Sequence, residues 1–427
     1  MTRQEELHDV IDKIAEEISR PLSQDTKLRE LFRNCFVSTA KTTTRFLEDE
    51  ETYVFTGDIE AMWLRDSSAQ VVHYLPFASK YPIIKRMIKG LLKRQITYIG
   101  LDPYANAFNE MDNGNCWEED LTERSPWIWE RKYEVDSLCY PVWLLKQYWD
   151  QTGDTEIFSK ECRKVLYRII DLWKTEQNHE SESNYTFMRL NCPPSDTLSH
   201  DGMGTPTAYT GMTWSGFRPS DDACRYHYLI PSNMFAVVVL GYIKEFAKTI
   251  YHDNCLYEKA ATLRDEIEAG IQRYGRCDLK EHGTIYAYET DGLGNYHFMD
   301  DANVPSLLSI PWLGYLDKED PIYKRTRAFL LSENNPYYYK GKKAKGIGSP
   351  HTPTDYIWHI SLTMQGLTAA DQEEKEALLQ MLLDTDGDTG YMHEGFHADD
   401  PNQYTRSWFA WANSLFALFV MEIRNLI

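Results

Sequence analysis

The sequence is short of positive charge and of long apolar runs. Its 427 residues include 45 Lys plus Arg against 65 Asp plus Glu, a formal net charge of −20. This deficit argues against binding to phosphate backbones or to anionic membrane surfaces, because both need basic patches. The longest apolar run, residues 235–243, reaches about half of a membrane span. We therefore expect neither nucleic acid nor membrane among its partners.

Other missing patterns exclude further classes. The eight cysteines include no CxxC pair, so we expect reduced, mostly buried thiols and not a disulfide framework. The motifs GxGxxG after a strand, GxxxxGK[ST] and GxSxG are absent, which argues against dinucleotide-binding, P-loop and α/β-hydrolase proteins. The first residues carry no apolar signal-peptide core, so a cytoplasmic location is expected.

Helical periodicity dominates what is present. Apolar residues recur at helical spacing in about a dozen segments, near residues 4–20, 27–46, 58–77, 83–98, 132–150, 155–177, 231–250, 254–273, 302–315, 320–332, 353–369, 372–385 and 405–427. β patterns are short and few, and no Pro/Gly/Ser-rich linker divides the chain. The helices are joined by long loops rich in Trp and acidic residues, and loops of that length are usually functional. We expect an all-α toroid of helix hairpins in one domain, residues 1–427, with an open helical array as the alternative.

Two of these segments combine aromatic and charged side chains. The segment 57–67 carries Trp63, Arg65 and Asp66, with Asp58 expected to cap their helix. An indole beside a guanidinium–carboxylate pair suits a sugar subsite, although a buried ion pair explains it about equally well. The segment 113–134 interleaves Trp with acids. In a chain with 13% aromatic residues, both favour a cleft in which rings stack on sugars and carboxylates accept hydroxyl hydrogen bonds.

Two further segments carry paired or isolated carboxylates. Asp221 and Asp222 follow a proline in FRPSDD, where one could act as an acid while the other orders the turn; a plain capping pair is the alternative. Glu394 lies in HEGFH, ahead of a Trp-rich helix. At their spacing, His393 and His397 could bind one metal ion only if the segment were helical, and the third ligand of a catalytic zinc site is missing. We expect no metal and no cofactor.

Together the segments over residues 57–416 resemble glycoside hydrolase family 125. The resemblance rests on the runs GDIEAMWLRDS, NCWEED, WERKYEVDSLCYP, TWSGFRPSDDA, YLIPSNMFAVV, DDANVPSLLSIP, GIGSPHTPTDYIWHISL and HEGFHADDPNQYTRSWFAWANSLFA. It implies an (α/α)₆ barrel and an exo-acting α-1,6-mannosidase that inverts configuration without a metal. It also implies a general acid at Asp221, with Asp222 as the rival, and a general base at Glu394.

An exo-enzyme needs a blind pocket that holds every hydroxyl of one sugar. Our candidates for that pocket are polar or aromatic residues of the long loops: Trp63, Arg65, Asp66, Asn115, Trp117, Glu130, Asp222, Asn303, His351 and Arg406. The expected partners are α-1,6-linked manno-oligosaccharides or N-glycan fragments, and the oligomeric state is not indicated. Two alternatives are a glucoamylase-like exo-hydrolase and a glycan-binding protein without catalysis.

Overall fold

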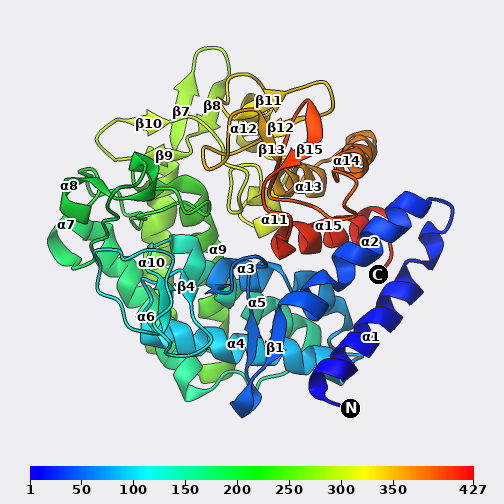
Figure 1. The fold of residues 1–427 in the computed structure, drawn as a ribbon. Coiled ribbons are helices and arrows are strands. Elements are labelled where there is room, and N and C mark those ends of the chain that lie inside the picture. The colour runs from blue at the N-terminus through cyan, green and yellow to red at the C-terminus, as the bar shows by residue number, and fades with distance from the viewer. The chain divides into compact units, whose positions relative to one another are not determined.

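A computed structural model describes residues 1–427. Contacts within the chain divide it into two compact units. Figure 1 labels their helices and strands. The first unit comprises Met1–Gln95, Leu144–Ile157 and Tyr337–Ile427, and the second comprises Ile96–Trp143 and Phe158–Pro336. The expectation of one catalytic domain stays a prediction.

The first unit combines long helices with short antiparallel strands. Its elements are α1 (Arg3–Ile18), α2 (Thr26–Ser38), β1 (Thr44–Phe46), β2 (Thr52–Val54), β3 (Met62–Trp63), α3 (Leu64–Ala69), β11 (Tyr338–Lys340), β12 (Lys345–Ile347), β13 (Tyr356–Trp358), α13 (His359–Leu367), α14 (Gln372–Asp384), β14 (Gly395–His397), β15 (Asp400–Tyr404) and α15 (Ala410–Ile423). Helix α15 packs against α2 and α13. Strand β14 lies between β13 and β15, so it fixes the chain that follows Glu394.

The second unit is built in the same way. Its elements are β4 (Ala107–Phe108), β5 (Ile128–Glu130), α6 (Lys160–Thr175), α7 (His179–Glu182), α8 (Ser199–Gly202), β6 (Tyr228–Leu229), α9 (Ile230–Phe246), α10 (Asn254–Tyr274), β7 (Arg276–Leu279), β8 (Gly283–Tyr286), β9 (Glu289–Thr290), β10 (Tyr296–His297), α11 (Ile310–Leu313) and α12 (Pro321–Leu330). Helices α4 (Pro82–Leu101) and α5 (Val135–Thr152) contribute residues to both units. No helix is both long and apolar enough to cross a membrane.

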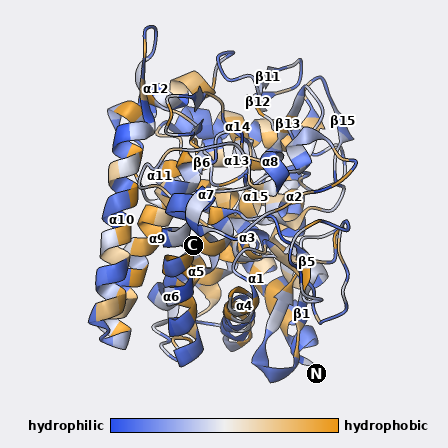
Figure 2. Cartoon of the chain, turned by 90° about the vertical axis from the view of Figure 1, so that its left-hand side faces the viewer, coloured by the Kyte–Doolittle hydropathy of each residue, from blue (hydrophilic) through white to orange (hydrophobic).

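The pair α9 and α10 illustrates why the sequence folds as it does. Helix α9 is apolar on nearly every face, and its side chains from Ile230 to Val237 are all buried. Helix α10 alternates hydrophobic and hydrophilic residues (Figure 2). Its stripe Leu256, Leu263 and Ile267 is buried, and the helix packs against α9. The predicted helical spacing in this region is therefore confirmed.

Three other expectations need correction or confirmation. The segment 302–315 is helical only over Ile310–Leu313, and 58–77 is divided among β3, α3 and a 3₁₀ turn at Val72–Phe77. Short strands are more numerous than the alternation in the sequence indicated, because many span only two or three residues. All eight cysteines are free, as predicted, and four of them are buried.

Candidate active site

The Asp221–Asp222 pair lies on a tight turn of the second unit. Phe217 and Ala223 pair as an antiparallel bridge. Within it, the Arg218 amide donates to the Asp222 carbonyl at 2.8 Å and the Asp221 amide donates to the Arg218 carbonyl at 2.9 Å. Asp221 occupies the tip with φ +67°, a left-handed conformation that Asp adopts more readily than most residues. Its side chain is half-buried, whereas Asp222 is buried.

Three side chains anchor this turn. The Arg218 guanidinium donates to Glu289 at 2.6 Å, and the Ser220 hydroxyl donates to Asp301 at 2.7 Å. Burial raises the pKa of Glu289, but the charge of Arg218, together with hydrogen bonds from His297 and Arg218, more than offsets this and holds that pKa below its usual range. The Lys132 ammonium donates to the main-chain carbonyl of Asp221 at 2.8 Å. The tip is therefore held by hydrogen bonds to its backbone.

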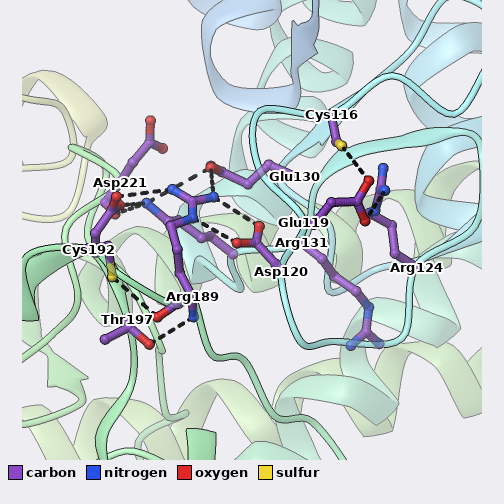
Figure 3. A network of polar contacts seen from close by, with 12 residues as sticks. Cys116, Glu119, Asp120, Arg124, Glu130, Arg131, Arg189, Cys192, Thr197 and Asp221 are labelled. Atoms are coloured by element: carbon purple, nitrogen blue, oxygen red, sulfur yellow. Dashed lines mark hydrogen bonds and ion pairs between the residues drawn. The ribbon is translucent and has the colours of Figure 1, made fainter.

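A polar network beside Asp221 is centred on Glu130 and Arg189 (Figure 3). The Asn106 side-chain amide donates to Glu130 at 3.2 Å and to Asp221 at 3.4 Å. Arg189 donates to the other oxygen of Glu130 at 2.9 Å and makes two hydrogen bonds to Asp120, at 2.7 and 2.9 Å. Burial raises the pKa of Glu130, the charge of Lys132 lowers it, and the Asp221 carboxylate raises it again, with a net increase. Two carboxyl groups thus share one donor.

Lys132 carries the balancing positive charge. Burial would lower its pKa, but the charges of Glu130, Asp221 and Asp196 raise that pKa above its ordinary value. Its ammonium lies 2.5 Å from Asp196 and 3.9 Å from Glu130. Lys132 is therefore a buried cation beneath the turn.

Asn303 is held on a neighbouring loop of the same unit. Its amide N–H donates to Asp301 at 3.4 Å. Its side-chain Nδ2 is buried and makes no hydrogen bond to the protein. An unpaired buried donor costs about 1–3 kcal/mol, so such a group calls for an explanation. A sugar hydroxyl would satisfy it.

The first unit contains a second cluster of candidate residues around β3 and α3. Arg65 and Asp66 form a buried ion pair at 2.6 Å, and the Arg65 guanidinium lies 5.7 Å from the centre of the Trp411 ring. The Trp63 indole N–H is buried without a hydrogen-bond acceptor in the protein, and so is the side-chain Nδ2 of Asn303. Asp58 does not cap this helix as expected, because α3 begins after Trp63 and Asp58 pairs with Arg406 instead.

Glu394 lies on the rigid segment that leads into β14. The His393 amide donates to the His359 ring at 2.9 Å, and the Gly395 amide donates to the Thr405 hydroxyl at 3.0 Å. The Glu394 side chain is 8% exposed, and its Oε1 lies 3.7 Å from Nη1 of Arg406. Neighbours on both sides are thus fixed, and the carboxylate faces a cation.

The His393–His397 spacing does not form a metal-binding arrangement. The His393 ring stacks on Tyr404 with centroids 3.8 Å apart and bonds to the Thr389 hydroxyl at 3.0 Å. His397 lies half-buried on β14. No cluster of three or more His, Cys, Asp or Glu side chains suited to a metal ion occurs in the chain.

Comparison with known proteins decides the family. A family model described as "Metal-independent alpha-mannosidase (GH125)" matches residues 25–421. The chain belongs to this GH125 family. The predicted resemblance is thereby confirmed, and with it the assignment of the chain as an α-mannosidase.

Individual relatives agree with the family match. A Streptococcus pneumoniae member of a family of metal-independent α-mannosidases, solved as a non-productive complex with α-1,6-mannobiose, is 46% identical, with a TM-score of 0.96 and 98% of each chain covered. The Schizosaccharomyces pombe "meiotically up-regulated gene 157 protein" is 36% identical over 97% of this chain and 85% of its own length. A bacterial glucoamylase in complex with acarbose shares 12% identity, with a TM-score of 0.55 over 92% of this chain and 55% of its own. That likeness concerns the fold alone, a helix-rich glycosidase fold.

Three sugar-binding candidates of this GH125 chain lie on exposed loops. Asn115 is exposed and its carbonyl accepts bonds from Asn109 and Arg124, at 2.9 and 3.4 Å. Trp117 is 55% exposed, and His351 is also exposed. Their roles stay predictions.

The network also contains residues that the sequence did not single out. Asn106, Lys132 and Arg189 contact the candidate acid or its neighbour Glu130. They are isolated polar residues in loops, and no local spacing distinguishes them from ordinary surface residues. Only their burial reveals them.

Proposed function

We propose that this GH125 member is an exo-acting enzyme that releases terminal mannose from the non-reducing ends of α-1,6-linked mannosides, with inversion of configuration. The observation that carries the substrate assignment is the 46% identity, over 98% of both chains, to the Streptococcus pneumoniae protein that binds α-1,6-mannobiose. Short α-1,6-mannosides, free or from N-glycans, are the proposed substrates.

The proposed mechanism is a single displacement with two carboxyl groups. Asp221 is the general acid that protonates the leaving oxygen, and Glu394 is the general base that activates a water on the opposite face of the sugar. Asp221 is supported by its place at the tip of a turn whose backbone is held by Arg218 and Lys132. Glu394 is supported by the rigid segment that holds it and by the cation beside it.

Sugar recognition is proposed to use buried polar groups. The orphaned donors of Trp63 and Asn303 support direct contacts with sugar hydroxyls. The buried Arg65–Asp66 pair offers a fixed donor and acceptor beside the Trp411 ring. Recognition by rigid, buried polar groups would suit an enzyme that must distinguish one terminal sugar from its epimers.

We also propose that the helices form an (α/α)₆ barrel and that the enzyme acts in the cytoplasm on imported mannosides. The helix-rich fold and its likeness to glucoamylase support the barrel. Mannosidase activity recovered only from the culture supernatant would contradict the cytoplasmic location.

Proton NMR of α-1,6-mannobiose with fresh enzyme tests the function and the mechanism together. β-Mannose is expected to accumulate first and then to mutarotate, and a sample of pure mannose gives the mutarotation rate for correction. α-Mannose as the first product would mean retention, and Glu394 could then not be a simple base. No release of mannose would refute the α-1,6 specificity. A parallel α-1,6-glucoside is expected to remain intact.

A further inference from the structure

Glu130 is a buried carboxylate beside the proposed general acid. Its side chain is 5% exposed. One of its oxygens accepts from the Asn106 amide at 3.2 Å and the other from Arg189 at 2.9 Å. Both oxygens therefore accept hydrogen bonds from the protein.

The Asn106 amide links Glu130 directly to the acid. Its Nδ2 also donates to Asp221 at 3.4 Å, while its carbonyl oxygen accepts from the Lys132 amide at 3.1 Å. That second bond fixes which way the amide points. Two oxygens that share one donor nitrogen lie at most the sum of the two distances apart, about 6.6 Å, close enough for their charges to interact strongly in a buried site.

Two cations lie near Glu130, but each of them also contacts other carboxylates. Arg189 divides its guanidinium among Glu130, Asp120 and Asp196. The Lys132 ammonium lies closer to Asp196, at 2.5 Å, than to Glu130, at 3.9 Å. Besides these groups, the adjacent Asp222 adds a further buried carboxyl beside the tip. Acids thus outnumber cations around the proposed acid.

We propose that Glu130 is a positioning residue: held beside Asp221 by Asn106, it forms with Asp221 a coupled pair of carboxyl groups that keeps one proton, which Asp221 delivers, and it is not a ligand of the substrate. The inference rests on the proposed function, because it assigns Glu130 a task in that reaction. A like charge held nearby disfavours ionisation of a carboxyl group. An acid that must retain its proton near neutral pH needs such a neighbour or an apolar wall.

The test is the pH dependence of kcat/KM on α-1,6-mannobiose for wild type, Glu130→Gln and Glu130→Asp. Glu130→Gln keeps the shape and the acceptor for Asn106 but removes the charge, so the alkaline limb is expected to move down by about one pH unit. Glu130→Asp keeps the carboxyl group. The alkaline limb of its pH profile is therefore expected within a few tenths of a pH unit of the wild-type limb. Glu123→Gln removes an exposed charge from the preceding loop and is the matched control, with an unchanged profile.

A second variant keeps the proposal testable if Glu130→Gln does not fold. Lys132→Gln removes a facing cation, so its alkaline limb is expected to move up. A folded Glu130→Gln or Lys132→Gln with an unmoved limb overturns the proposal, and so does a rise in KM alone, which indicates a substrate ligand. If wild type itself releases no mannose, the proposed function fails, and this is distinct from turnover with an unmoved limb.

Discussion

Replacing Asp221 with Asn removes a titratable proton from the candidate acid and little else. The side chain keeps its shape, and Asn tolerates the left-handed φ of +67° at the turn tip. Lys132 bonds to the main-chain carbonyl, which the substitution leaves in place. The Asn106 amide can still donate to an amide oxygen. Because the site is half-exposed, we expect the free energy of unfolding to change by no more than about 0.5 kcal/mol.

The catalytic loss is expected to depend on the leaving group. General acid catalysis contributes roughly 10²–10⁴-fold, or about 3–5 kcal/mol of barrier. α-1,6-Mannobiose expels a sugar alkoxide, which needs the proton, so kcat/KM should fall by that factor. 2,4-Dinitrophenyl α-mannoside expels a stable phenolate, so its kcat/KM should stay within about tenfold of wild type.

The assay compares kcat/KM on both substrates for Asp221→Asn and Asp222→Asn, with unfolding in urea as the stability control. Asp222 is buried, and its substitution is expected to affect both substrates alike. A leaving-group-dependent loss in Asp222→Asn, with Asp221→Asn close to wild type, would mean that the acid is the neighbouring residue. Equal losses on both substrates for Asp221→Asn would refute its role as an acid.

Four further outcomes are expected. Glu394→Gln should lower kcat by at least about 10²-fold on both substrates, since the water needs a base whatever the leaving group; steady-state kinetics on the dinitrophenyl mannoside checks this. Arg218→Met leaves Glu289 buried without its cation and should cost about 3–5 kcal/mol in urea unfolding. Ile267→Ala opens the α9–α10 interface and should cost about 2–5 kcal/mol in the same measurement. Burial lowers the pKa of His227 to about 4, so the unfolded chain binds the proton first and stability is lost as pH falls from about 6.5 to 4. His227→Phe should make that pH slope shallower by about 1.4 kcal/mol per pH unit.

Long amphipathic helices could be predicted from the sequence because their burial follows local spacing. The stripe of α10 is an example, from Leu256 to Ile271. The structure of segment 302–315 could not be predicted in this way, because Asp300 accepts hydrogen bonds from the Leu307 and Leu308 amides at 2.8 and 3.0 Å. A side chain that satisfies backbone amides offers the chain an alternative to a helix. Apolar spacing alone does not reveal that competition.

The candidate site divides in the same way. Asp221 and Glu394 stand in distinctive runs of sequence, so a family resemblance reaches them. Arg189 stands outside those runs, and Lys132 stands inside one without any feature that marks it; each becomes notable only when the fold buries it against carboxylates. The position of Asp58 in the sequence predicts a helix cap. In the structure its carboxylate instead accepts a hydrogen bond from Arg406, 348 residues away. Contacts between distant segments decide such cases.

The two candidate carboxyl groups lie in different surroundings. An inverting glycosidase needs one carboxyl that holds its proton and one that is ionised. Asp221 shares a donor with the buried Glu130, and a neighbouring negative charge favours a protonated acid. Glu394 instead lies 3.7 Å from the guanidinium of Arg406, while the Lys132 ammonium lies 2.8 Å from the Asp221 carbonyl. Each candidate thus has a cation nearby, and only Asp221 has Glu130 as a partner through Asn106, so the leaving-group dependence of Asp221→Asn and Glu394→Gln is the observation that assigns the two roles.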